Sequence, residues 1–216
     1  MTSRRGVFLL ALGVVVAAPA LARAEDEEDG AYGRLDGDFM LHLGAGAALA
    51  AGGPALTLET GALYLSTAGA YFRYADALGS DGARVRRALA SGLELRPLFL
   101  ARYAKNNEAG PAHLDLFVDS LTFQVGAWWD SDRRAPDPGL ARTPGLEIGL
   151  GLDVPILARA SGPYVGMRGV LRWRAADLDG AGKDDVVDRG ALLSLMLAWH
   201  HVFYTHLVDA GDRVLR

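Results

Sequence analysis

The chain has 216 residues, of which 50% are hydrophobic and 22% charged, with a formal net charge of −4 and a mean hydropathy of +0.13. This composition excludes a disordered chain and is more apolar than that of a typical soluble domain, and the acidic balance argues against nucleic acid as a partner. There is no cysteine, which excludes disulfides, thiolate metal sites, a cysteine nucleophile and a lipidated cysteine.

The N-terminal residues have the layout of a targeting signal. Two arginines at positions 4 and 5 precede an apolar stretch over residues 6–21, and small residues fill both positions that a signal peptidase reads, Ala22 and Ala24. We predict a signal peptide over residues 1–24, cleavage before Glu25, and then an acidic tail over residues 25–37. An uncleaved anchor is the alternative, but the apolar stretch is short for a bilayer of roughly 30 Å.

No later segment has the 18 or more apolar residues that a membrane-spanning helix needs. An exported, apolar chain of this kind is either a soluble periplasmic domain or an outer-membrane barrel, in which each tilted strand needs only about ten residues.

Alternation of apolar with small or polar residues recurs along the chain and predicts β-strands. It is clearest over residues 38–49 and 146–156. The expected strands cover residues 38–49, 55–65, 68–77, 88–96, 121–129, 146–156, 165–174 and 191–200. We therefore predict an all-β fold, an antiparallel up-and-down transmembrane barrel of about eight strands over residues 38–207, followed by a C-terminal tail over 208–216.

Residues 111–121 do not fit the alternation. Leu114, Phe117, Val118 and Leu121 have helical spacing, with two aspartates on the opposite side, and Pro111 is well placed to start a helix. Two interpretations remain open: a short helix on the periplasmic side, or a longer fifth strand.

The non-apolar strand face carries charged residues among many glycines and alanines, which suit the crowded interior of a narrow barrel. We predict that these residues project into the lumen and pair with one another as a structural charge network: His42, Glu59, Arg73, Glu94, Arg96, Glu147, Asp153, Arg168, Arg172, Arg174 and His200.

Aromatic residues gather towards strand ends, as in the interfacial girdles of lipid-facing barrels. With both termini in the periplasm, the girdle residues are Phe39, Phe72, Trp128, Trp129, Trp173, Trp199 and Phe203. A soluble lipocalin-type barrel also alternates, with its apolar face inward, so alternation alone does not decide which face meets solvent.

This pattern resembles the small eight-stranded bacterial outer-membrane proteins, in the broad sense of the barrel domain of outer membrane protein A, over about residues 38–207. The resemblance rests on architecture and not on a motif. It implies outer-membrane lipid and the barrel assembly machinery as partners. Such proteins often end on an aromatic residue that the machinery reads, whereas here a tail follows Phe203 and Tyr204 and runs to Arg216.

The sequence predicts no cofactor, metal or catalytic residue. Gly44 to Leu49 looks like a dinucleotide loop only superficially, because no helix follows it, and the adjacent histidines His200 and His201 point to opposite faces of a strand. The expected function is an outer-membrane barrel with a structural or surface-interaction role, a plugged lumen and an unknown surface ligand. The alternatives are a soluble periplasmic lipocalin-like carrier of an apolar ligand and, second, an envelope-lipid-modifying enzyme.

Overall fold

The structure is a computed structural model, and it describes residues 32–50, 53–77, 85–105, 107, 110–132, 139–178 and 189–205. The predicted signal peptide, residues 25–31 of the acidic tail and the C-terminal tail lie outside the described residues.

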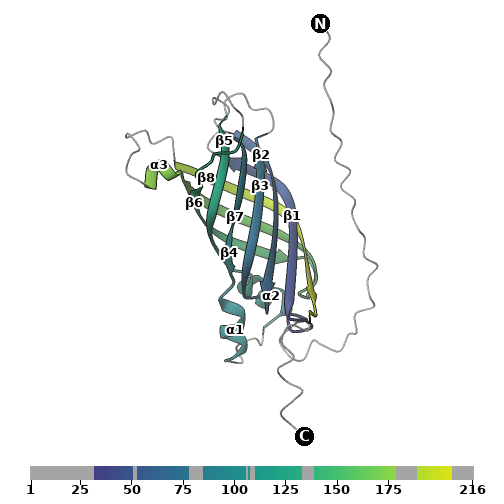
Figure 1. Cartoon of the computed structure of the whole chain (residues 1–216). Coiled ribbons are helices and arrows are strands. Elements are labelled where there is room, and N and C mark those ends of the chain that lie inside the picture. Colours follow the sequence, from purple (N-terminus) through teal and green to yellow (C-terminus); the bar gives the residue numbers. More distant parts are fainter. Residues whose placement is uncertain are drawn as a thin grey trace.

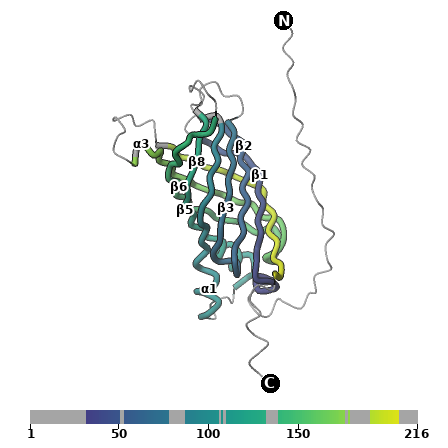
Figure 2. The backbone as a smooth tube through the Cα atoms, in the orientation of Figure 1, coloured from purple at the N-terminus to yellow at the C-terminus, as the bar shows by residue number. Residues whose placement is uncertain are grey.

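Eight antiparallel strands pair in sequence order and close into a barrel, because β1 also pairs with β8. The strands tilt strongly around the barrel axis, and the tube in Figure 2 follows an up-and-down path (Figures 1 and 2). The strands are β1 (Phe39–Ala50), β2 (Gly53–Tyr64), β3 (Ala68–Asp76), β4 (Val85–Leu95), β5 (Thr122–Asp132), β6 (Gly145–Pro155), β7 (Gly162–Trp173) and β8 (Arg189–Phe203). All eight strand predictions are confirmed; β4, β5, β7 and β8 extend by a few residues beyond the expected ranges.

Within the described ranges, three short helices lie in the connections between strands: α1 (Leu98–Tyr103), α2 (Ala112–Asp119) and α3 (Ala175–Leu178). The structure decides the ambiguous segment in favour of a helix, α2, which starts after Pro111 as its spacing predicts. Helix α1 was not predicted. Helices α1 and α2 lie at the end of the barrel where β1 begins and β8 ends, and α3 lies at the opposite end (Figure 1). We call these the α2 end and the α3 end. None of the described helices is long and apolar enough to span a bilayer.

The β2–β3 connection at the α2 end is a hairpin turn of three residues, Leu65 to Thr67. Leu65 and Ser66 both have positive φ, 47° and 53°, and the amide of Thr67 donates to the carbonyl of Tyr64 at 3.0 Å. Two consecutive left-handed residues are the hairpin geometry that matches strand twist, although neither residue is a glycine. The amide of Leu65 also donates to the carbonyl of Asp38, at 2.8 Å, which fastens the hairpin to the start of β1.

Two small apolar layers close the ends of the lumen. At the α2 end, Met40, Leu63 and Val202 pack with Leu116 of α2, and at the α3 end alanines of β1, β2 and β3 pack with Val170 and Leu192. The strand register places the charged residues between these layers. The charged middle of the barrel is therefore shielded from water at both ends by apolar contacts.

Candidate functional site

The structure places ten of the eleven predicted lumen residues on the inner face, each at most 7% exposed. They are His42, Glu59, Arg73, Glu94, Arg96, Glu147, Asp153, Arg168, Arg172 and His200. Arg174 is different: it follows the last residue of β7, lies at the rim of the α3 end and bonds with Asp130. Arg174 thus has an acidic partner, as expected, but it lies past the end of β7, where strand alternation no longer assigns a face.

The first level of this network lies along the strand ladders. Directly opposite residues on neighbouring strands form Glu59–Arg73 across β2–β3 and Glu147–Arg172 across β6–β7. The Arg73 Nε donates to Glu59 at 2.8 Å, and the Arg172 Nε donates to Glu147 at 2.6 Å. Register and face together are sufficient to produce these pairs.

The second level crosses the lumen between strands that are not neighbours. Arg168 on β7 donates to Glu59 on β2 at 2.8 Å, and Arg96, just after β4, donates to Asp153 on β6 at 2.9 Å. Arg73 on β3 also bonds with Glu147 on β6.

Together these contacts form an uninterrupted ring of seven side chains, here called the lumen ring. Its members, in order of contact, are Arg73, Glu59, Arg168, Asp153, Arg96, Glu94 and Gln124, and Gln124 returns the ring to Arg73. The sequence analysis did not include Gln124, because an uncharged amide on a strand carries no signal for a charge network. The Gln124 side-chain carbonyl accepts a hydrogen bond from Arg73, and its amino group donates one to Glu94 at 3.1 Å. Gln124 therefore connects the Arg73–Glu59 pair to the Glu94–Arg96 pair.

The network is balanced in charge. It holds four carboxylates, Glu59, Glu94, Glu147 and Asp153, and four guanidinium groups, Arg73, Arg96, Arg168 and Arg172. Every one of these eight groups has at least one oppositely charged partner within 3.0 Å. Balance matters because a single unpaired charge in a dry interior is strongly destabilising.

Glycines give the network its room. A Cβ placed on Gly61 would lie 2.2 Å from the His42 Nε2, one on Gly151 would lie 2.5 Å from the Arg168 Cδ, and one on Gly166 would lie 2.8 Å from the Asp153 Oδ1. The His42 ring, which lies 3.2 Å from Glu94, occupies the space that a side chain at position 61 would fill.

We expect Gly61→Ala to lower the free energy of unfolding by about 1–3 kcal/mol, because the stiff imidazole of His42 must move. Gly169→Ala is the matched control, since its Cβ would meet nothing within 4 Å, and we expect a change within about 0.5 kcal/mol. Urea unfolding of both variants in detergent micelles measures the difference. Equal stabilities would contradict the crowded lumen.

A second cluster of ion pairs closes the α2 end, and we call it the cap cluster: Tyr32, Arg34, Arg102, Asp115 and Asp119. The Tyr32 hydroxyl donates to Asp115 at 2.9 Å, and Arg102 bonds with Asp115 and, at 2.7 Å, with Asp119. Arg34 bonds with Asp119, and its guanidinium carbon lies 4.1 Å from the centre of the Phe99 ring. The sequence analysis missed this cluster. It placed Tyr32 and Arg34 in the acidic tail, yet both are buried.

Burial alone would raise the pKa of the Asp115 carboxyl, but the hydrogen bonds from Arg102 and Tyr32 outweigh burial and hold this pKa below its ordinary value of 3.8. The charged carboxylate therefore favours the folded cap. This contribution is complete above pH 3.8 and is lost as the pH falls through the lower pKa of the folded state.

We expect α2 to detach from the cap cluster on acidification while the barrel strands stay paired. An NMR titration of the α2 amides in micelles, from neutral to acid pH, follows this change. Asp115→Asn removes the titrating group, so its spectrum should resemble the acid form of the wild type at neutral pH. An α2 spectrum that changes at the same pH in both proteins would assign the transition to another group.

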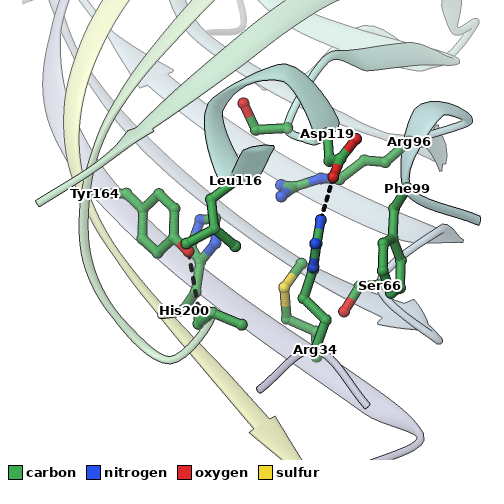
Figure 3. A pocket seen from close by; sticks show the side chains of 11 residues that line it. Arg34, Ser66, Arg96, Phe99, Leu116, Asp119, Tyr164 and His200 are labelled. Atoms are coloured by element: carbon green, nitrogen blue, oxygen red, sulfur yellow. Dashed lines mark hydrogen bonds and ion pairs between the residues drawn. The ribbon is translucent and has the colours of Figure 1, made fainter. Parts of the chain in front are cut away.

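Between the lumen ring and the cap cluster lies a cavity of about 20 Å³, enough for a buried water. Figure 3 shows Arg34 reaching Asp119 on one side of it and Tyr164 on the other, with Leu116 between them. Two buried polar atoms on its wall, Ser66 Oγ and His200 Nε2, have no hydrogen-bond partner among the described residues. The His200 ring stacks on Tyr164 with ring centres 3.9 Å apart.

The outer face is mostly apolar, with few exposed polar residues on the strands, among them Thr60, Arg87 and His201. Leucines on β1, β4, β6 and β8 have highly exposed side chains: Leu43 is 62% exposed, Leu93 61%, Leu150 59% and Leu197 64%. Arginine and glutamate fill the interior instead. This distribution is the reverse of a lipocalin, whose apolar face lines its cavity, and it overturns the carrier alternative. The chain is a transmembrane β-barrel of the outer-membrane type.

Some of the predicted girdle residues lie on the outer face near the barrel ends, and others do not. At the α2 end Phe39 contacts both Tyr64 and Phe203, with ring centres 5.6 and 6.3 Å apart, and Trp199 is 58% exposed. Trp129 and Trp173 are half-buried near the α3 end. The prediction for Trp128 was wrong: it is 4% exposed, donates its indole N–H to the carbonyl of Trp173 and lies 5.2 Å from the Arg172 guanidinium. Adjacent strand residues face opposite sides, so Trp128 and Trp129 could not both face lipid.

Phe72 is also misplaced as a girdle residue. It faces outward, at 46% exposed, but lies at the midpoint of β3 and not at its end. Its position in a strand of nine residues puts it within the apolar band and away from the rim.

No family model matches the sequence, and no curated protein does. Among solved structures, similar chains include the N-terminal barrel domain of Pseudomonas aeruginosa OprF (8% identity, TM-score 0.45, covering 75% of this chain and 97% of that one). Acinetobacter baumannii CarO2 has 11% identity and a TM-score of 0.43 (75% and 99% covered), and the outer membrane protein OprG of P. aeruginosa has 11% and 0.40 (77% and 97%). The barrel assignment follows from the closed strand pairing and the apolar exterior of this chain.

Two histidines, His42 and His200, lie in the lumen, each beside a carboxylate. His200 is buried in the lumen and lies 3.5 Å from Asp153, and His42 lies 3.2 Å from Glu94. Among the residues that the structure describes, no group of three or more potential ligands is arranged to hold a metal ion. His206 and the acidic loop 179–188 lie outside the described residues.

Proposed function

We propose that this chain is an integral protein of the bacterial outer membrane whose lumen is closed to ions, and that its role is structural or depends on surface interaction. Export by the predicted signal peptide and insertion by the barrel assembly machinery are part of this proposal. The α2 end, which carries both ends of the barrel domain, then faces the periplasm.

The observation that carries the closed lumen is the lumen ring. Seven side chains, six of them on the strands β2 to β7 and Arg96 just after β4, bond to one another across the interior, and all seven are at most 4% exposed. Eight strands leave an interior that side chains just fill. An ion that entered would have to separate a carboxylate from a guanidinium group in a dry environment, which is strongly unfavourable.

The cap cluster also supports a closed lumen, because it covers the α2 end of the barrel. A solute that passed the lumen ring towards the periplasm would next meet α2, held by Arg34 and Arg102 over the mouth. The enzyme alternative finds less support: His200 points inward, and the outward-facing His201 has Phe203, not a serine, two residues further along the strand.

Planar-bilayer recording tests the proposal. We expect no reproducible single-channel steps from the purified wild-type protein. Arg73→Ala/Glu59→Ala serves as the matched variant, because it shortens two members of the lumen ring and keeps the charges balanced; it should conduct more than the wild type. Stable steps from the wild type would refute the closed lumen.

A further inference from the structure

Helix α2 is turned with its charged side towards the protein. Asp115 and Asp119 are 1% and 4% exposed, whereas Leu114 is 53% exposed. Leu114 belongs to a stripe at helical spacing with Phe117, Val118 and Leu121, and Leu121, just past the helix, is 38% exposed. Both aspartates face inward beside Leu116, which is also buried, whereas a helix on a soluble protein would turn its carboxylates to water.

Helix α1 repeats this arrangement in a shorter form. Phe99 is buried beneath the Arg34 guanidinium, while Leu100 and Tyr103 are each 37% exposed. Arg102, the one basic residue of its last turn, is drawn inward by Asp115 and Asp119 and does not interrupt the outer side. The helix extends beyond the ends of the strands, along the direction of β4 (Figure 1).

These apolar sides continue the exterior of the barrel. Leu95 and Phe123 are opposite one another in the β4–β5 ladder and are 41% and 39% exposed. Helix α1 begins three residues after Leu95, and α2 ends just before β5. The polar residues in the two connections, Arg96 and Ser120, are both 4% exposed and point inward. No outward polar side chain therefore separates the strand leucines from the helices.

We propose that α1 and α2 form a lipid-binding shelf, with Leu100, Tyr103, Leu114 and Leu121 lying in the headgroup region of the inner leaflet. This inference rests on the membrane location proposed above. Amphipathic interfacial helices bury their apolar faces about 5–10 Å into this region, and six residues of helix α1 span about 9 Å, which is comparable. Lys105, exposed two residues after the end of α1, marks the aqueous side of the shelf, with its ammonium beyond the lipid phosphates.

The absence of native cysteine makes the shelf testable by site-directed spin labelling of the full chain. Single variants Leu100→Cys and Leu114→Cys report on the shelf, Leu93→Cys on the barrel exterior and Lys105→Cys on the aqueous side. All four sites are exposed, and heat-modifiable gel mobility checks that each variant folds. The labelled proteins are reconstituted in phosphatidylethanolamine–phosphatidylglycerol vesicles and compared for relaxation by oxygen and by a water-soluble nickel chelate.

We expect the labels at positions 100 and 114 to be about fivefold less accessible to the nickel chelate than the label at 105, and shallower than the label at 93. Labels at 100 and 114 as accessible as at 105, with 93 shielded, would overturn the shelf and leave the barrel proposal intact. An accessible label at 93 would instead refute the membrane location itself. Spin–spin broadening at 114 would identify a second copy of the chain as the occupant, which also overturns the shelf.

Discussion

Replacing Arg73 with methionine is expected to lower the free energy of unfolding by about 3–5 kcal/mol, because it leaves an excess carboxylate in the dry lumen. Arg73 has three buried partners, Glu59 and Gln124 within the lumen ring and Glu147 beside it. Glu59→Leu should be destabilising by a similar amount for the opposite reason, since it leaves an excess guanidinium group.

The double variant Arg73→Met/Glu59→Leu separates pairing from packing. It leaves Arg168 bonded to Asp153 and Arg172 bonded to Glu147, so three carboxylates again balance three guanidinium groups. We expect the double variant to lose less stability than the sum of the losses in the two single variants. The difference, which is the coupling free energy of the pair, should exceed about 0.5 kcal/mol. Urea unfolding of the four proteins completes the cycle. Additive effects would mean that the two residues act independently.

Leu150→Arg is expected to lower stability by about 2–4 kcal/mol in a bilayer. Leu150 is the midpoint of β6 and is 59% exposed, so the guanidinium group would enter the hydrocarbon region. Leu140→Arg is the matched control: it makes the same change at a site 45% exposed but outside the strands, where we expect about 0–1 kcal/mol. Folding into lipid vesicles measures both. Equal effects would place Leu150 outside the hydrocarbon.

The faces of the strands could be predicted from the sequence, and the partners across the lumen could not. A period of two assigns Glu59 and Arg73 to the inner face, and the β2–β3 register then places them opposite one another. The contact of Arg168 with Glu59 joins β7 to β2, and it depends on the closure and shear of the barrel. No local pattern encodes that relation. The girdle prediction was wrong for Trp128 because it grouped aromatic residues by their position along the strand. It did not apply the two-residue alternation that assigns each residue to a face.

Helix α2 shows a different limit. Its spacing predicted a helix, but sequence rules written for soluble proteins turn the apolar side of a helix inward. Here the interior is polar, so the aspartates Asp115 and Asp119 are inside and Leu114 is outside. The basic partners Arg34 and Arg102 lie 85 and 17 residues from Asp119, beyond the range of any helical pairing rule.

The cap cluster also sets an order of events during assembly. Tyr32 and Asp115 are separated by 83 residues and lie on opposite sides of the first four strands in the chain. For them to meet, the growing sheet must curl far enough to bring the start of β1 near the segment before β5, and the entropy cost of closing a loop of this length disfavours the contact early in folding. Docking of α2 therefore depends on the curvature of the sheet, and it does not require that β1 has already paired with β8. A nascent sheet that stayed flat would keep both aspartates in water and leave α2 undocked.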